Sequence, residues 1–425
     1  MLEKLQHDTF QYFLREVNPA NGLVKDTTRK ESPCSITATG LGLAAYTVGV
    51  VRGWISREEA ANRSLTTLRF LWNSEQSDRP GATGYKGFYY HFLNMETGRR
   101  AWKSELSTID TTFLMAGALA GAAFFDKDEA AEHEIRELAD ALYRRVDWQW
   151  ALNGEVTVSH GWKPEIGFLE YRWTGYNEAI LLYALAHGSP THPLPAESYQ
   201  AWTKTYRWEK PYGIEFLFAA PLFVHQLAHV WIDFRGIQDA YMREKGIDYF
   251  ENSRRATYAQ REYAIHNPHR FKGYHENCWG ITASDGPGPA RRIVDGMERH
   301  FYGYAARGIV EGPDDGTIAP WAAITSLPFA PEIVLPAIKH FEENYPEVTS
   351  KYGFKCSFNP TFPANSGHGW ISQGYYGLDQ GPIVVMIENY RSGFFWDLMK
   401  KCPYLVEGLR RAGFEGGWLE PGHFL

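Results

Sequence analysis

Several features are missing from this sequence, and their absence argues against whole classes of function. No apolar run reaches about 18 residues, so no membrane-spanning helix is expected. The chain has no long basic stretch and a formal net charge of −7, which argues against a nucleic-acid partner and against an anionic membrane surface. The 4 cysteines lack C-x-x-C spacing and no G-x-G-x-x-G or Walker pattern occurs, so we expect neither a metal nor a nucleotide cofactor.

Aromatic residues, in contrast, are frequent. The 425 residues include 15 Trp and 25 Tyr, and aromatics make up 15% of the chain. With 44% hydrophobic and 22% charged residues, the composition is that of a globular protein and not of a disordered one. Flat amphipathic rings suit the faces of sugars, so we expect some of them to line a cleft, with an aromatic-rich core as the alternative.

Helical periodicity dominates the chain, and strand patterns are few. The expected helices span residues 2–17, 36–52, 57–72, 109–125, 130–146, 177–187, 215–230, 236–265, 332–344, 382–391 and 404–412. No Ser/Gly-rich or charged linker marks a boundary, so residues 1–425 are expected to form one all-α domain. Helices that are apolar all round, such as 109–125, would form an inner ring, and amphipathic ones, such as 57–72, an outer ring.

Several carboxylates stand at the starts of apolar helices. "SELSTID" carries Glu105 and Asp110, "GYNEAILLY" carries Glu178, and "GLDQGP" carries Asp379. In a ring of helices the inner N-termini point toward the rims, so these acids could converge on one cleft. The alternative is helix capping. Ser107 with Asp110 resembles a capping box, and Asp379 shortly before a proline suits an ordinary cap.

Glu178 is the acid that capping explains least. It follows the aromatic cluster of "WTGYNE", whose rings would exclude water and raise the pKa of its carboxyl group. The helix N-terminus expected at Asp379 would instead favour the ionised form of its carboxyl group. Cleavage of a glycosidic bond needs one carboxyl group of each kind, so Glu178 suits the general acid and Asp379 the general base. Either role could fall to Asp110 or Glu105.

Two other segments combine polar and aromatic groups. "PLFVHQLAHVWIDFRG" places His225, His229 and Asp233 at four-residue steps, which would put them on one helical face. Sugar binding and structural pairing, such as Asp233 with Arg235, are both open, whereas a metal site lacks the Glu of an H-E-x-x-H motif. The loop "YHENCWGITASDGPG" is the second such segment. The candidate substrate-binding residues are Trp173, Tyr176, Asn177, His225, His229, Trp231, Asp233, Arg235, Trp279, Asp285 and Tyr376.

Ordered blocks along most of the chain carry a resemblance to a known family. They include "KSELSTIDTTFLMAGAL", "GYNEAILLYALAHGSPTHPL", "NCWGITASDGP", "DGTIAPWAAITSLPF" and "YYGLDQGPIVVMIENYRSG". These blocks resemble the glycoamylase-like domain of endo-β-1,2-glucanases of glycoside hydrolase family 144, of sophorose-releasing enzymes and of cyclic β-1,2-glucan synthases. The resemblance implies an (α/α)6 barrel that hydrolyses β-1,2-glucan with inversion and without a metal. It implies that the functional acids are Glu178, Asp379 and either Glu105 or Asp110.

Other functions stay open at this point. An α-glucan hydrolase or a transglycosylase could use the same fold, and a polysaccharide lyase or a non-catalytic glycan-binding protein would belong to different classes. A lyase would need cations to hold a uronate, which the net charge of −7 disfavours. We expect a monomer whose partner is a glucan, located in the periplasm or secreted after loss of a leader, with the cytoplasm as the alternative.

Overall fold

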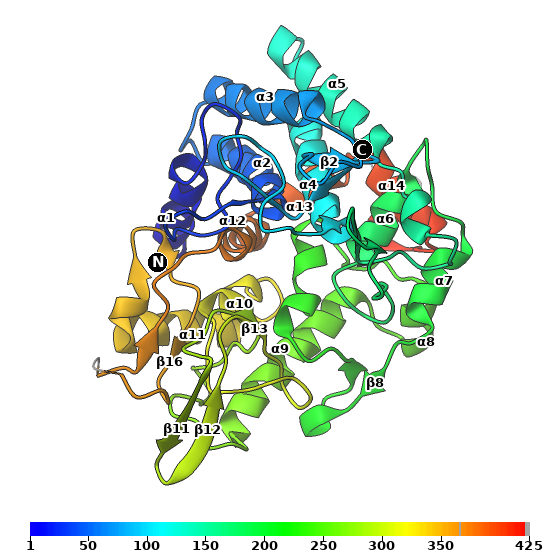
Figure 1. Ribbon diagram of the computed structural model, residues 1–425. Helices are drawn as coiled ribbons and strands as arrows, with labels where there is room; N and C mark the ends of the chain where they lie inside the picture. The colour runs from blue at the N-terminus through cyan, green and yellow to red at the C-terminus, as the bar shows by residue number, and fades with distance from the viewer. Residues whose placement is uncertain (365–366, 421–425) are drawn as a thin grey trace.

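Helices are the main elements of the computed structural model, which describes residues 1–364 and 367–420 (Figure 1). The α-helices are α1 (Leu2–Arg15), α2 (Ile36–Val51), α3 (Arg57–Asn73), α4 (Thr108–Phe124), α5 (Ala130–Arg145), α6 (Ile180–Gly188), α7 (Glu197–Thr203), α8 (Ala240–Lys245), α9 (Tyr249–His266), α10 (Pro320–Thr325), α11 (Pro331–Asn344), α12 (Gly377–Arg391), α13 (Phe394–Met399) and α14 (Pro403–Arg411). Most of the expected helices are confirmed, although the expected helix 236–265 is divided into α8 and α9. The short helices α7, α10 and α13 were not expected. Among the described residues, no helix is both long and apolar enough to span a membrane.

The apolar helices pack on one another, and the amphipathic helices cover them. Helix α2 contacts α4 and α12, α4 also contacts α6, and α12 contacts α10 (Figure 1). Nearly every residue of α2, α4, α6 and α12 is buried, as expected for helices that are covered on all sides. On the outside, α1 packs on α12, α5 on α4, α14 on α6 and α11 on α10. The expected division into inner and outer helices holds for these pairs.

Short antiparallel strands occupy the connections between the helices. One five-stranded sheet runs in the order β2 (Gly84–Tyr85), β3 (Phe88–Tyr90), β5 (Leu106–Ser107), β6 (Gly161–Lys163) and β7 (Gly167–Phe168). The other strands pair in twos: β1 (Cys34–Ser35) with β4 (Phe92–Leu93), β8 (Trp208–Glu209) with β9 (Phe216–Leu217), β10 (Ala283–Ser284) with β13 (Ala305–Ala306), β11 (Ala290–Val294) with β12 (Met297–Phe301), β14 (Thr349–Ser350) with β15 (Gly353–Phe354), and β16 (Phe358–Asn359) with β17 (Trp370–Ile371). Because β5 leads directly into α4 and β1 into α2, these ladders fix where the inner helices begin.

The segment 215–230 differs from the expected helix. It contains β9 and two 3-10 turns, η3 (Leu222–His225) and η4 (Leu227–Val230). Pro221 precedes the first turn and has no N–H to donate, and Gln226 leaves helical geometry between the turns, with φ −124°. The sequence-based expectation of one helical face is thereby corrected for His225, His229 and Asp233.

A buried ion pair fastens the β10–β13 ladder. Arg307 and Asp315 are both fully buried, and Arg307 Nε lies 2.8 Å from Asp315 Oδ1. The Arg307 guanidinium also donates to the backbone oxygens of Ser284 and Gly303. We expect Arg307→Met to lower the free energy of unfolding by about 3–5 kcal/mol, because Asp315 would keep a buried charge without its partner.

Urea unfolding followed by circular dichroism would measure this loss. Arg291→Met is the matched control, because Arg291 is exposed on β11, which pairs with β12 and not with this ladder. Equal stability of the two variants would contradict the assignment of Arg307 as the residue that holds this ladder.

Candidate active site

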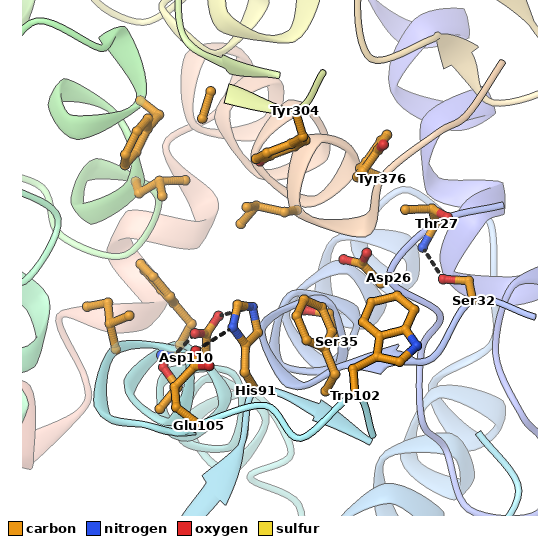
Figure 2. Close-up of a pocket in the computed structure, with 18 of the residues that line it drawn as sticks. Asp26, Thr27, Ser32, Ser35, His91, Trp102, Glu105, Asp110, Tyr304 and Tyr376 are labelled. Atoms are coloured by element: carbon orange, nitrogen blue, oxygen red, sulfur yellow. Dashed lines mark hydrogen bonds and ion pairs between the residues drawn. The ribbon is translucent and has the colours of Figure 1, made fainter. Parts of the chain in front are cut away.

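One cavity of about 730 Å³ brings together acids from segments that are far apart in the sequence (Figure 2). Glu105, Asp110 and Glu178 line it, and so does Asp26. The sequence predicted that acids at the starts of inner helices would converge, and for Glu105, Asp110 and Glu178 the structure confirms that placement. The cavity is therefore the site in which the chemistry of these carboxyl groups has to be considered.

Glu178 lies in the turn directly before α6. Asn177 shapes this turn, because its Oδ1 accepts hydrogen bonds from the N–H of Ala179 at 3.1 Å and from the indole N–H of Trp202 at 3.3 Å. Burial raises the pKa of Glu178 to about 7, and the nearby charge of Asp110 adds to this effect. Glu178 can therefore hold a proton close to neutral pH, as its aromatic context predicted.

Glu105 is held beside a histidine that carries positive charge. His91 Nδ1 lies 2.8 Å from Glu105 Oε1, and His91 Nε2 lies 3.5 Å from Asp110 Oδ1. Although burial opposes it, the charge of Asp110 and the hydrogen bond with Glu105 raise the pKa of His91 to about 9. Burial would by itself raise the pKa of Glu105, but the hydrogen bond and charge of His91 lower it overall. At a mildly acidic pH, Glu105 is thus ionised while Glu178 is protonated.

Asp110 is tied to the start of α4. The hydroxyl of Ser107 accepts a hydrogen bond from the Asp110 N–H at 3.1 Å and donates to Asp110 Oδ2 at 2.6 Å. Thr37 donates to Asp110 Oδ1, also at 2.6 Å. The capping alternative is confirmed for Asp110. Because both of its carboxylate oxygens already accept hydrogen bonds, Asp110 acts on the site mainly through its charge, which keeps His91 protonated.

Asp379 does not reach the cavity. Its neighbours Tyr376 and Leu378 line the wall, whereas Asp379 is 1% exposed and is not part of the lining. Burial raises the pKa of Asp379 well above its usual range, and a hydrogen bond with Cys356 offsets this only in part. Desolvation therefore outweighs the helix N-terminus that was expected to favour ionisation. The assignment of Asp379 as the general base does not fit this placement.

Trp173 and Tyr376 line the cavity, as expected of rings that bind substrate. The other expected substrate-binding residues are not part of the wall: Tyr176, Asn177, His225, His229, Trp231, Asp233, Arg235, Trp279 and Asp285. Burial and pairing within the protein explain these corrections. His229 is 1% exposed and bonds to Ser253 Oγ, and burial lowers its pKa to about 3. Asp233 pairs with Arg235 at 2.7 Å, which is the structural alternative for these two residues.

Sequence reasoning missed several residues of the wall. His91 follows β3, Asp26 lies in the connection between α1 and α2, and Tyr304 precedes β13, so none of them stands at the start of a helix. Tyr304 faces Tyr376 with 5.8 Å between the ring centroids. Trp102 carries a signal that could have been used, because an aromatic residue among the charged residues of "GRRAWKSE" is a poor candidate for the core.

Two groups of side chains have a spacing that suits a metal ion. Within the described residues, potential ligand atoms lie within 4.8 Å of one another in the group His91, Glu105 and Asp110 and in the group His275, Cys278 and His340. In the first group both nitrogens of His91 face carboxylates, at 2.8 Å from Glu105 and 3.5 Å from Asp110. In the second, the two histidines share a hydrogen bond of 3.1 Å between their Nε2 atoms.

Comparisons with known proteins show which family the chain is similar to. A family model described as "Putative glucoamylase" matches residues 170–403. A putative glucoamylase from Bacteroides uniformis has a crystal structure with a TM-score of 0.86 and 33% identity, covering 99% of this chain and 98% of that one. The endo-β-1,2-glucanase from Chitinophaga pinensis, solved with sophorotriose and glucose, has a TM-score of 0.85 and 31% identity, covering 98% of both chains.

A curated relative has a more specific description. It is an exo β-1,2-glucooligosaccharide sophorohydrolase from Parabacteroides distasonis, 26% identical over 97% of this chain, which spans 57% of the length of that relative. Glu178 falls within the range matched by the family model, and Glu105 precedes it. The structural similarity extends over 99% of the chain and so includes both residues. On the family model and these structures together, the chain belongs to the putative glucoamylase family.

Proposed function

We propose that the protein hydrolyses β-1,2-linked glucan. The observation that carries the proposal is the opposite tendency of two carboxyl groups in one cavity: Glu178 holds a proton and Glu105 does not. Such a pair is what glycosidic-bond cleavage by a general acid and a general base requires. The linkage is supported by the relatives, since the Chitinophaga pinensis enzyme is an endo-β-1,2-glucanase and the Parabacteroides distasonis relative is a sophorohydrolase.

In the proposed mechanism Glu178 gives its proton to the glycosidic oxygen of the leaving glucan. The Glu105 carboxylate takes a proton from a water molecule, whose oxygen forms the new bond to the anomeric carbon as the bond to the leaving oxygen breaks. His91 keeps Glu105 ionised and oriented through the 2.8 Å contact of its Nδ1. Attack by water on the face opposite the leaving group inverts the anomeric configuration, which agrees with the inversion that the family resemblance implies.

We further propose that residues 1–425 form a single (α/α)6 barrel. The inner positions would be taken by α2, α4, α6, the η3–η4 segment, α10 and α12. The contacts of α2 with α4 and α12, of α4 with α6 and of α10 with α12 support the arrangement, as do the outer helices that pack on them. In such a barrel the starts of α4 and α6 face the same mouth, which explains why Glu105 and Glu178 share a cavity.

The substrate can be tested directly. The protein is incubated with linear β-1,2-glucan and, separately, with starch, and new reducing ends are followed together with ultraviolet absorbance. Reducing ends from β-1,2-glucan alone are expected, formed with inverted configuration when observed by nuclear magnetic resonance. Products from starch alone would instead favour an α-glucan hydrolase, longer chains a transglycosylase, and an ultraviolet signal a lyase.

The pH dependence follows from Glu178. A general acid works only while protonated, and burial raises the pKa of Glu178 to about 7. Activity on β-1,2-glucan should therefore fall as the pH rises through about 7, by about tenfold for each further pH unit. Measurement of kcat/KM between pH 5 and about 9 would show this limb, and an unchanged rate across the range would contradict the role of Glu178.

A further inference from the structure

Trp102 stands at the cavity in an unusual backbone conformation. Trp102 and Lys103 both adopt left-handed geometry, with φ 53° and 50°, which is uncommon outside glycine. Arg100 holds the loop, because its guanidinium donates to the backbone oxygens of Lys103 at 2.9 Å and of Ser104 at 2.6 Å. The result is an indole that lines the cavity and yet is 67% exposed. Strained backbone of this kind is concentrated at ligand sites.

The indole is connected to the acids through aromatic contacts. The ring of Trp102 lies 5.1 Å from that of Phe92, and Phe92 stacks on His91 with 3.9 Å between ring centroids. His91 in turn holds Glu105. A run of ring contacts therefore extends from the exposed indole to the residues proposed to carry out catalysis.

Asp26 supplies a polar group to the same cavity. Its backbone is fixed, because its N–H donates to Pro33 O at 2.8 Å and its carbonyl oxygen accepts from the Gly377 N–H at 2.8 Å. Its carboxylate, in contrast, has neither a hydrogen bond nor an ion pair with any other residue that the structure describes. In Figure 2 the Asp26 side chain projects into the open centre of the cavity, in the same part of the view as Trp102. Burial, together with the charge of Asp110, raises the pKa of Asp26 to about 6.

We propose that Trp102 and Asp26 form a glucosyl-binding subsite next to the catalytic acids, a step that rests on the proposed function. The indole stacks on one face of a sugar ring, and the Asp26 carboxylate accepts hydrogen bonds from hydroxyl groups at the edge of that ring. A carboxylate fixed in a cavity without a protein partner gains most from a ligand that donates hydrogen bonds. Stacking of the sugar on the exposed indole also favours binding, because it removes apolar surface of the ring from water.

Binding can be measured without turnover in the Glu178→Gln background. The probe is a linear β-1,2-linked gluco-oligosaccharide, titrated into the protein by calorimetry. Adding Trp102→Ala should weaken binding about tenfold, and adding Asp26→Asn about tenfold to a hundredfold. In the variant with both changes, the loss should be smaller than the product of the two, because both residues hold one sugar ring.

Matched controls test whether the loss of binding is specific to Trp102 and Asp26 or follows the removal of any exposed indole or carboxylate. Trp72→Ala removes an exposed indole outside the cavity, and Asp78→Asn removes an exposed carboxylate there. Both controls should bind the oligosaccharide as the Glu178→Gln protein does. Normal binding by the Trp102→Ala and Asp26→Asn variants would overturn the subsite alone. If the Glu178→Gln protein itself fails to bind, while the unmodified protein releases no reducing ends from β-1,2-glucan, the proposed function falls.

Discussion

Glu178→Gln should lower the rate of β-1,2-glucan hydrolysis by about a thousandfold while leaving the fold intact. Gln has the same size as Glu but no proton to give, so the leaving oxygen would depart as an alkoxide. The effect should appear in kcat more than in KM, because the proton is transferred only in the transition state. Initial rates of reducing-end formation at pH 6 would measure it.

Stability gives an independent readout for the same variant. Because the pKa of Glu178 is raised from 4.5 to about 7, the folded protein binds this proton more tightly than the unfolded chain does. The resulting stability is present below the unfolded pKa and is lost as the pH rises through about 7. Gln does not ionise, so Glu178→Gln should unfold at a higher temperature than the unmodified protein at pH 8, with little difference near pH 5.

Glu155→Gln is the matched control, since Glu155 is exposed and is not part of the cavity wall. It should change neither the rate nor the pH dependence of unfolding. Full activity of Glu178→Gln would contradict the role of Glu178 as the general acid. Loss of activity together with loss of stability at every pH would mean instead that Glu178 supports the fold.

Local sequence patterns located part of this site, for identifiable physical reasons. Glu178 and Glu105 stand beside apolar helices with strong periodicity, so both the element and the acid at its start were visible. Asp26 and His91 lie in connections, where only the folded chain shows what they face. Asp379 has the same local context as a cap, and sequence alone did not indicate that its side chain would be desolvated.

The fold, like the site, could be predicted from local sequence only in part. The helices α2, α4 and α12 were found because the whole turn-by-turn pattern is apolar, whereas η3 and η4 interrupt a segment whose apolar residues also recur with helical spacing. Pro221 is the local signal for that interruption, but the helical spacing of the apolar residues around it favours a continuous helix. The pairing of β5 with β6 joins residues far apart in the sequence, which no local pattern specifies.

Glu105→Gln should also reduce hydrolysis by about a hundredfold to ten-thousandfold, because the amide cannot accept a proton from the attacking water. A second readout belongs to Glu105 alone. Its charge and hydrogen bond help to raise the pKa of His91 to about 9, so the pKa of His91 should fall in Glu105→Gln. Titration of His91 by nuclear magnetic resonance would measure this change, and Glu178→Gln should leave the pKa of His91 nearly unchanged.

Glu155→Gln again provides the control, because Glu155 is exposed and does not line the cavity. This variant should keep full activity, and the pKa of its His91 should stay unchanged. If Glu105→Gln lowers the pKa of His91 and yet retains activity, Glu105 positions the histidine and another carboxylate activates the water. Asp26 would then be the acid to replace next, because its carboxylate lines the same cavity and has no hydrogen-bond partner among the described residues. A joint loss of activity and of the raised pKa of His91 is the result that the proposed mechanism requires.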